Sequence, residues 1–233
     1  MHDAENKPSL RMRAWRRFFV TILVLSLLLF LPAGTLRYWP AWIFLALQML
    51  SWGYFFLVLM KRDPKLVERR LQAKEKDRAQ GIILKIFSVF LYAGLILSGL
   101  DFRFGWSRSH LGRLQLALII IGQAGVVASY GLIYWVMLTN TFASSTIQVE
   151  SGQRVIDTGP YARVRHPMYS GMVVTMLCCP LALGSYFALP VFAFIVPVLV
   201  ARLLHEERTL RRDLAGYTEY CARVRFRLVP GLW

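Results

Sequence analysis

LQLALIIIGQAGVVASYGLIYWVML, residues 114–138, is the stretch that decides the fold. It contains no Asp, Glu, Lys or Arg, and it exceeds the roughly 20 residues with which an α-helix crosses a ~30 Å hydrocarbon layer. Three similar blocks precede it, none with more than one ionised side chain: Phe18–Leu36, Pro40–Met60 and Ile82–Leu100. Because a helix satisfies its own backbone hydrogen bonds in lipid, such blocks predict membrane helices.

Two shorter apolar blocks follow, Gly171–Leu183 and Phe187–Leu203, and they meet at Gly184-Ser185. We expect them to form a C-terminal helical hairpin. The predicted fold is therefore all-α, a polytopic bundle of five to six membrane helices. The composition agrees with this, since 56% of the residues are hydrophobic and the mean hydropathy is +0.46, far above the needs of a soluble domain. The first block is too long for the apolar core of a signal peptide and is expected to remain as a span.

The net charge of +15 would suggest a nucleic-acid partner in a soluble protein, but its distribution predicts a membrane orientation instead. With six spans and a cytoplasmic N-terminus, 24 of the 28 Lys and Arg lie on the cytoplasmic side, which leaves Arg37, Arg103, Arg108 and Arg113 opposite. This is the positive-inside pattern. We expect an integral membrane protein, in a bacterial inner membrane, with both termini cytoplasmic and no nucleic-acid partner. A five-span arrangement would place the basic tail outside.

The chain is expected to be a single membrane domain, with N-terminal spans in residues 1–138 and the chemistry in residues 139–233. The polar loop of residues 139–170 and the charged tail from His205 onward concentrate polar residues on one side of the membrane. Between the second and third spans, residues 61–80 carry charges of both signs around Leu66, Val67 and Leu71. This segment is interpreted either as an amphipathic helix on the headgroup layer or as a surface linker.

The first candidate site is GPYARVRHPMYSG, residues 159–171. Arg165 and His166 offer several N–H donors beside a membrane span. Pro167 fits the first turn of a following helix, whose positive N-terminal end favours a carboxylate or phosphate. A basic anchor at the membrane interface is the plainer interpretation of the same residues.

The second candidate site is RLLHEER, residues 202–208, which continues from an apolar block. Arg202 and Glu206 are four residues apart and share one helix face. Ionised groups at the end of a membrane helix are costly unless they are paired or functional, so either a site or an ordinary ion pair is expected. The aromatic tail from Tyr217 to Val229 is expected to dock on the bundle without direct chemistry.

In their order along the chain, these motifs resemble the isoprenylcysteine carboxyl methyltransferase family over roughly residues 140–233. The matching features are Gly159-x-Tyr161, Arg165-His166-Pro167-x-Tyr169-x-Gly171, the apolar hairpin, Glu206-Glu207 and the aromatic tail. The resemblance implies a methyltransferase that uses S-adenosylmethionine in a cytoplasmic pocket, with Arg202 and Glu206 as catalytic residues, Arg202 as the substrate-binding residue, and no metal. It implies cofactor contacts from Gln153, Arg154, Val155, Ile156, Tyr161, Arg165, His166, Pro167, Met168, Tyr169 and Glu206.

The implied acceptor is a lipophilic small molecule or lipid-modified substrate that enters from the membrane lipids, such as the carboxylate of an isoprenylcysteine. A carboxylate is already ionised at pH 7 and needs no general base. Two other enzymes stay open as alternatives. One is an NADPH-dependent membrane sterol reductase, because enzymes of that kind have a segment similar to Tyr217–Cys221 of this chain. In that case Arg208, Arg211 and Arg212 would bind the extra phosphate of NADPH. A phospholipid N-methyltransferase is the other. A transporter or scaffold would carry ionisable residues inside its spans, where they are almost absent.

Overall fold

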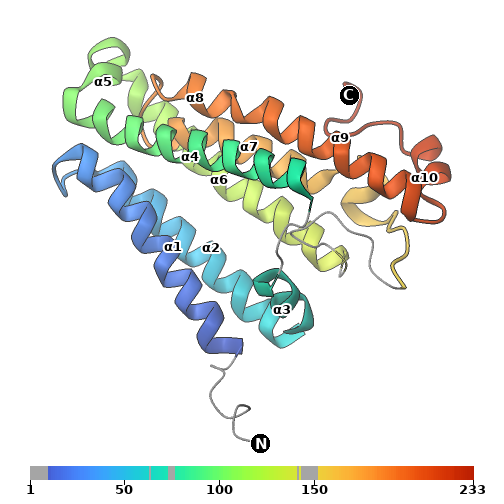
Figure 1. Ribbon diagram of the computed structural model, residues 1–233. Helices are drawn as coiled ribbons and strands as arrows, with labels where there is room; N and C mark the ends of the chain where they lie inside the picture. Colours follow the sequence, from blue (N-terminus) through green and yellow to red (C-terminus); the bar gives the residue numbers. More distant parts are fainter. Residues whose placement is uncertain (1–9, 63, 73–76, 141, 143–151) are drawn as a thin grey trace, which may run out of the picture.

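The computed structural model describes residues 10–62, 64–72, 77–140, 142 and 152–233, and every regular element within them is helical (Figure 1). The prediction of an all-α bundle is therefore confirmed. The elements are α1 (Leu10–Ala33), α2 (Trp39–Arg62), α3 (Pro64–Gln72), α4 (Arg78–Phe104), α5 (Trp106–Leu111), α6 (Leu114–Thr139), the 3₁₀ helix η1 (Gly159–Ala162), α7 (Pro167–Ala182), α8 (Leu189–Ala193), α9 (Ile195–Asp213) and α10 (Tyr217–Arg223).

Five helical stretches among the described residues are long and apolar enough to cross a membrane. Four of them are α1, α2, α4 and α6, and the fifth is the stretch Leu189–Asp213, which joins α8 and α9. Helix α7 is apolar but shorter. The protein is accordingly an integral membrane protein in which α7 pairs with α9 as the predicted hairpin.

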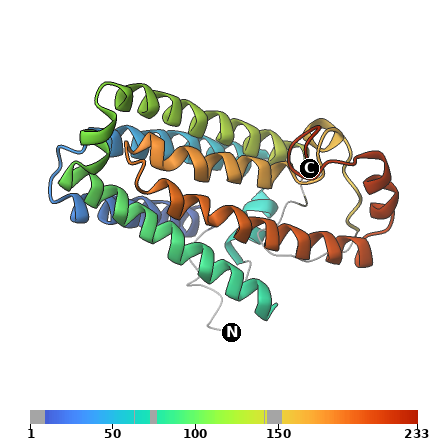
Figure 2. The ribbon, with the colours of Figure 1, turned by 90° about the horizontal axis from the view of Figure 1, so that it is seen from above.

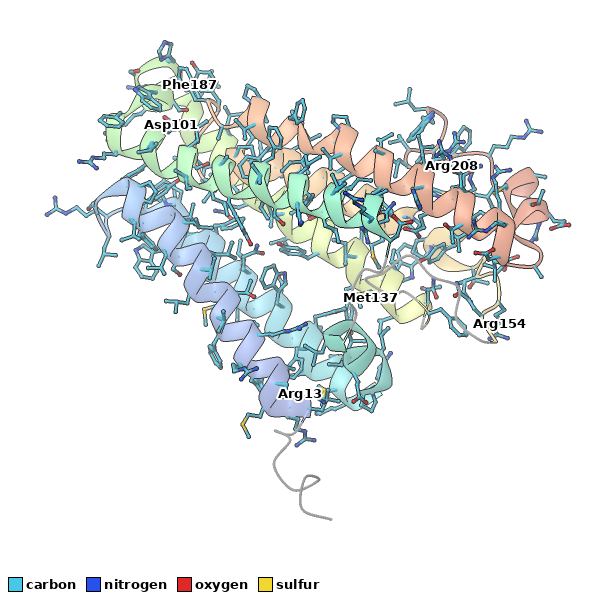
Figure 3. The ribbon with its side chains drawn as sticks, in the orientation of Figure 1. Arg13, Asp101, Met137, Arg154, Phe187 and Arg208 are labelled. Atoms are coloured by element: carbon cyan, nitrogen blue, oxygen red, sulfur yellow. The ribbon has the colours of Figure 1, made fainter. Side chains whose placement is uncertain are left out.

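Successive long helices run in alternating directions, which gives the bundle two distinct ends (Figure 1). The tail end carries α3, the start of α7 and α10. The turn end carries α5 and the connection of residues 183–188 between α7 and α8. Figure 3 shows Arg154 and Arg208 at the tail end and Asp101 and Phe187 at the turn end. Arg103 lies in the last turn of α4 and Arg108 in α5, whereas Arg37 and Arg113 lie in the connections α1–α2 and α5–α6. Among the described residues, these four arginines therefore lie at the turn end (Figure 1).

Helix α7 lies between α6 and α9, and α4 flanks α9 on the other side (Figure 2). The contact between α6 and α7 is close because small residues face each other across it. A Cβ atom placed on Gly122 would lie 2.2 Å from the backbone nitrogen of Ala182, and the hydroxyls of Ser129 and Thr175 are 2.7 Å apart. Small residues and interhelical hydrogen bonds of this kind hold helices together in membranes.

The apolar side of α3 packs inside the protein. Leu66 and Val67 are buried in one cluster with Ala14 of α1, Leu59 of α2 and Met137 of α6. The described part of residues 61–80 is thus neither a helix that rests on headgroups nor a surface linker. It closes the tail end of α1 and α2 against α6.

The predicted tip at Gly184-Ser185 does join α7 to α8, and it is buried. Ser185 is only 1% exposed, and its hydroxyl donates to the carboxylate of Asp101. Two side chains of α6 and Tyr38, which precedes α2, cap the carbonyls of the turn: Gln123 donates to Ala182 (3.0 Å), Tyr38 to Leu183 (2.7 Å) and Gln115 to Gly184 (2.8 Å). The polar backbone of the turn is therefore satisfied by protein groups, as a membrane environment requires.

Candidate functional site

The tail after α10 is hydrogen-bonded to the segment that leads into α7. The backbone N–H groups of Arg165 and His166 donate to the carbonyls of Phe226 (2.9 Å) and Arg227 (3.0 Å). The Ser170 hydroxyl donates to the Leu228 carbonyl at 2.7 Å. The tail thus docks on the bundle, and residues 159–170 are held in place by the last residues of the chain.

Glu207 of α9 is the centre of the electrostatic contacts at this junction. It is 4% exposed and accepts hydrogen bonds from Arg211 (2.8 Å), Arg227 (2.7 Å) and Arg165 (3.2 Å). His166 Nε2 lies 3.7 Å from the same carboxylate. Charge-assisted contacts of this kind are strong and directional. Three guanidinium groups face one carboxylate, so positive charge is in surplus among these four side chains.

The guanidinium of Arg165 forms hydrogen bonds with the tail. Its Nη1 donates to the carbonyls of Val224 and Arg225, both at 2.9 Å, while Nη2 meets Glu207. Its Nε is buried, and no described residue accepts a hydrogen bond from it. In this arrangement, the Nε–H of Arg165 is the group that remains for the predicted contact with a cofactor.

A second polar cluster joins three helices next to this junction. Tyr169 of α7 donates to Glu206 Oε2 of α9 at 2.6 Å, and the guanidinium of Arg202 of α9 lies close to the Tyr169 hydroxyl. Arg202 Nη1 in turn donates to Gln80 Oε1 of α4 at 3.1 Å. We call Gln80, Tyr169, Arg202 and Glu206 the three-helix cluster. Three predicted site residues thus meet, together with a glutamine that the sequence analysis did not single out.

The start of α4 is aligned with α9 by a second contact one turn away. Asp77 caps α4 by accepting the Gln80 N–H at 3.0 Å, and its other oxygen lies 3.4 Å from His205 Nε2. The hydrogen bond from Gln80, helped by the nearby His205, lowers the pKa of the Asp77 carboxyl below its ordinary value. Asp77 and Gln80 therefore face His205 and Arg202 as two matched pairs.

The other predicted cofactor residues lie around these two clusters. The Tyr161 hydroxyl accepts from Asn140 (3.0 Å), and its carbonyl accepts from Tyr220 (2.7 Å). Met168 packs on the cluster around Leu66, and Val155 packs on that of Tyr217 and Leu214. Pro167 is buried, Gln153 and Ile156 are half-buried, and Arg154 is exposed. These contacts do not gather the predicted residues around one common space, so their role in cofactor binding stays a prediction.

Several residues of the two clusters were given no site role by the sequence analysis. Glu207 was named only as part of the Glu206-Glu207 motif, although Arg211, which follows it by four residues on the same helix face, was a usable signal. Arg227, Tyr217 and Gln80 had none, since their contacts depend on how distant segments pack. The Tyr217 hydroxyl lies 3.4 Å from His166 Nε2, and burial, followed by the nearby Cys221 and Glu207, raises its pKa. It therefore stays a neutral partner for the imidazole.

With this geometry in view, the chain can be compared with known proteins. Its segment from the first turns of α6 to the end of α9 matches the model of the isoprenylcysteine carboxyl methyltransferase (ICMT) family. We call residues 118–212, which match this family model, the ICMT segment. The resemblance, drawn from the sequence over roughly residues 140–233, is confirmed as far as residue 212, where the match ends, and it favours a membrane methyltransferase. The ICMT segment begins within α6, whereas the sequence analysis began the catalytic region at residue 139, and that boundary stays a prediction.

Two curated relatives match shorter stretches. The chain is 32% identical over 90 residues to the Delta(14)-sterol reductase TM7SF2 of Mus musculus, which is 36% of this chain and 21% of that protein. It is 27% identical over 94 residues to the Uncharacterized protein YpbQ of Bacillus subtilis (strain 168), which is 39% of this chain and 56% of that protein. The matches therefore span about a fifth and about half of the relatives' lengths.

Proposed function

We propose that the protein is a membrane methyltransferase that transfers a methyl group from S-adenosylmethionine to the carboxylate of a lipophilic acceptor, such as an isoprenylcysteine. One observation carries the proposal. The ICMT segment contains the start of α7 and the end of α9, where Arg165, Tyr169, Arg202, Glu206 and Glu207 gather in two adjacent polar clusters. Ionisable groups concentrated at the end of membrane helices mark a functional site.

The side chains present fit the polar parts of S-adenosylmethionine. Positive charge is in surplus around Glu207, and the buried Nε of Arg165 has no acceptor among the described residues. Both features suit the carboxylate of the cofactor. The carboxylate of Glu206, which Tyr169 orients, suits its ammonium or hydroxyl groups. When bound, the cofactor would supply an electrophilic methyl group on a sulfonium that leaves as a thioether.

Arg202 is the residue we assign to the acceptor. A guanidinium can hold a carboxylate by two parallel hydrogen bonds and remains charged where solvation is poor. Arg202 is 8% exposed and is oriented from two sides, by Gln80 and by Tyr169. Because a carboxylate is already ionised at pH 7, no side chain has to remove a proton. The chain's contribution is then alignment of the acceptor and exclusion of water.

The location of the clusters supports a cytoplasmic site. They lie at the tail end of the bundle, on the side opposite to Arg37, Arg103, Arg108 and Arg113. By the positive-inside rule the tail end, with its many basic residues, faces the cytoplasm. Cofactor would then enter from the cytoplasm, and a lipophilic acceptor from the membrane.

A second candidate, an NADPH-dependent sterol-type reductase, is favoured by the 32% identity over 90 residues to the mouse sterol reductase. The arginines that would hold the extra phosphate weigh against it, because Arg211 is paired with Glu207 and Arg212 with Asp213. Phospholipid N-methylation is less well supported, because the charge of Arg202 would repel a cationic amine acceptor.

Calorimetry of the detergent-purified protein with S-adenosylhomocysteine, and separately with NADPH, tests the proposal. We expect the first to bind. His166→Ala and Glu206→Gln should each weaken that binding by about 1.5–3 kcal/mol, the usual scale for hydrogen bonds to charged groups, whereas Glu219→Gln on the exposed side of α10 should not. Binding of NADPH without S-adenosylhomocysteine would overturn the function. Unchanged affinity in both site variants would overturn the site.

A further inference from the structure

Gln80 is a fully buried polar side chain with only half of its amide satisfied. It lies in the first turn of α4 and is 0% exposed. Its Oε1 accepts from Arg202 at 3.1 Å, whereas its Nε2 has no hydrogen-bond partner among the residues that the structure describes. Buried polar groups are nearly always hydrogen-bonded, so an orphaned amide NH₂ points to a missing partner.

The orientation of this amide is fixed by the chemistry of its neighbour. A guanidinium carries only donors, so the atom that faces Arg202 must be the amide oxygen. The NH₂ group, bonded to the same carbon, then faces elsewhere but stays within the width of one amide of the guanidinium. The orphaned NH₂ of Gln80 therefore lies beside a charged guanidinium. An anionic group such as a carboxylate is the acceptor that suits this position.

We propose that Gln80 is a substrate-binding residue that donates from Nε2 to the acceptor's carboxylate while its Oε1 positions the guanidinium of Arg202. This inference rests on the proposed function and names the anionic group of its substrate. Gln80 lies outside the ICMT segment of residues 118–212, so recognition of the acceptor is shared between the N-terminal helices and the matched segment. The Asp77–His205 contact one turn away fixes the register of α4 against α9.

Gln80→Glu separates this role from a structural one. A carboxylate at this position would still accept from Arg202, so the contact between α4 and α9 should persist. It would supply no NH₂ and would repel an acceptor carboxylate. Ala79→Glu is the matched control, because it adds the same charge one residue earlier on an exposed position of α4.

The probes are N-acetyl-S-farnesylcysteine and its carboxamide, which differ only in the charge of the acceptor group. Binding is measured by titration calorimetry in detergent with S-adenosylhomocysteine present, and the melting temperature of each variant is recorded. We expect Gln80→Glu to weaken binding of the carboxylate probe at least tenfold, with little change for the carboxamide and no drop in melting temperature. Ala79→Glu should bind both probes as the unaltered protein does.

The outcomes separate the two proposals. If the unaltered protein fails to bind S-adenosylhomocysteine, the proposed function fails. If it binds S-adenosylhomocysteine but Gln80→Glu holds the carboxylate probe as tightly as before, or if the unaltered protein binds neither probe, the inference is overturned. Should Gln80→Glu not fold, Gln80→Met takes its place. It removes the donor without adding charge and should raise the KM for the carboxylate probe about tenfold, with unchanged affinity for S-adenosylhomocysteine.

Discussion

The carboxylate of Glu207 connects three separate segments at the tail end of the bundle. Its partners come from three places: Arg165 from the segment before α7, Arg211 from the next turn of α9, and Arg227 from the tail. A buried charge is tolerated only with close, well-oriented partners. Because Arg165 also donates to the carbonyls of residues 224 and 225, Glu207 indirectly holds the tail against the bundle.

Glu207→Gln should therefore destabilise the protein strongly. The neutral amide leaves Arg165 buried without its counter-charge, and breaking a buried ion pair costs about 3–5 kcal/mol. We expect a lower melting temperature together with faster hydrogen exchange in residues 224–228. Glu219→Gln, on the exposed side of α10, is the control and should change neither. Unaltered exchange in the tail of the Glu207 variant would contradict the anchoring role.

At the residue scale the sequence predicts local pairs better than distant ones. Helix periodicity placed Arg202 and Glu206 on one helix face, and the predicted hairpin placed that helix beside the one that carries Tyr169, but a contact with Tyr169 was not predicted. The contact between Gln80 and Arg202 joins residues 122 positions apart. It depends on the axial register of α4 against α9, which hydropathy does not specify. The contact of Arg227 with Glu207 could not be predicted either, because the path of a tail without regular structure leaves no periodic pattern in the sequence.

At the scale of helices, length and hydropathy specify the membrane spans, whereas the packing of the connections between helices depends on individual side chains. Asp101 at the end of α4 accepts from the backbone of Ser107 at 2.7 Å and from the hydroxyls of Ser107 and Ser185. It thereby links α4, α5 and the turn after α7. An isolated carboxylate there would be expensive, so its partners explain its burial. The sequence could place the turn but could not predict that it would be buried.

The closest helix contact in the bundle, between α6 and α7, has a testable requirement for glycine. In Gly122→Ala the new Cβ would meet the backbone of Leu181 and Ala182 at 2.2–2.8 Å. Backbone atoms cannot rotate away as a side chain can, so the helices must separate, and overpacking of this kind costs about 1–3 kcal/mol or more.

Gly131→Ala is the matched control for Gly122→Ala on the same helix. Apart from the backbone of its own helix, no described residue has an atom within 4 Å of a Cβ placed on Gly131, and alanine is the better helix former by roughly 1 kcal/mol. Thermal unfolding in detergent should therefore show Gly122→Ala less stable than the unaltered protein and Gly131→Ala equal to it or more stable. Equal melting temperatures for the two variants would mean that α6 and α7 pack less closely than described.

For the whole molecule, the alternating directions of α1, α2, α4, α6, α7 and α9 place both the start of α1 and the end of α9 away from the turn end, although apart from each other (Figure 1). The same alternation gathers Arg37, Arg103, Arg108 and Arg113 at the turn end. Charge distribution and helix direction are independent features of the chain, and they divide it in the same way. With the positive-inside rule, both predict a cytoplasmic tail end.

Cysteine labelling from each side of the membrane tests this orientation. Ser185, at the tip of the hairpin, cannot serve because it is buried. Ser109 of α5 and Thr218 of α10 are exposed at the turn end and the tail end. In intact cells a membrane-impermeant maleimide should label Ser109→Cys but not Thr218→Cys, and in inverted vesicles the pattern should reverse. The unaltered chain supplies the background from its own cysteines, of which Cys179 and Cys221 are buried.

Labelling of both variants from one side would contradict the alternating arrangement. A pattern reversed throughout would keep the fold but place the two polar clusters outside the cytoplasm, where S-adenosylmethionine could not reach them.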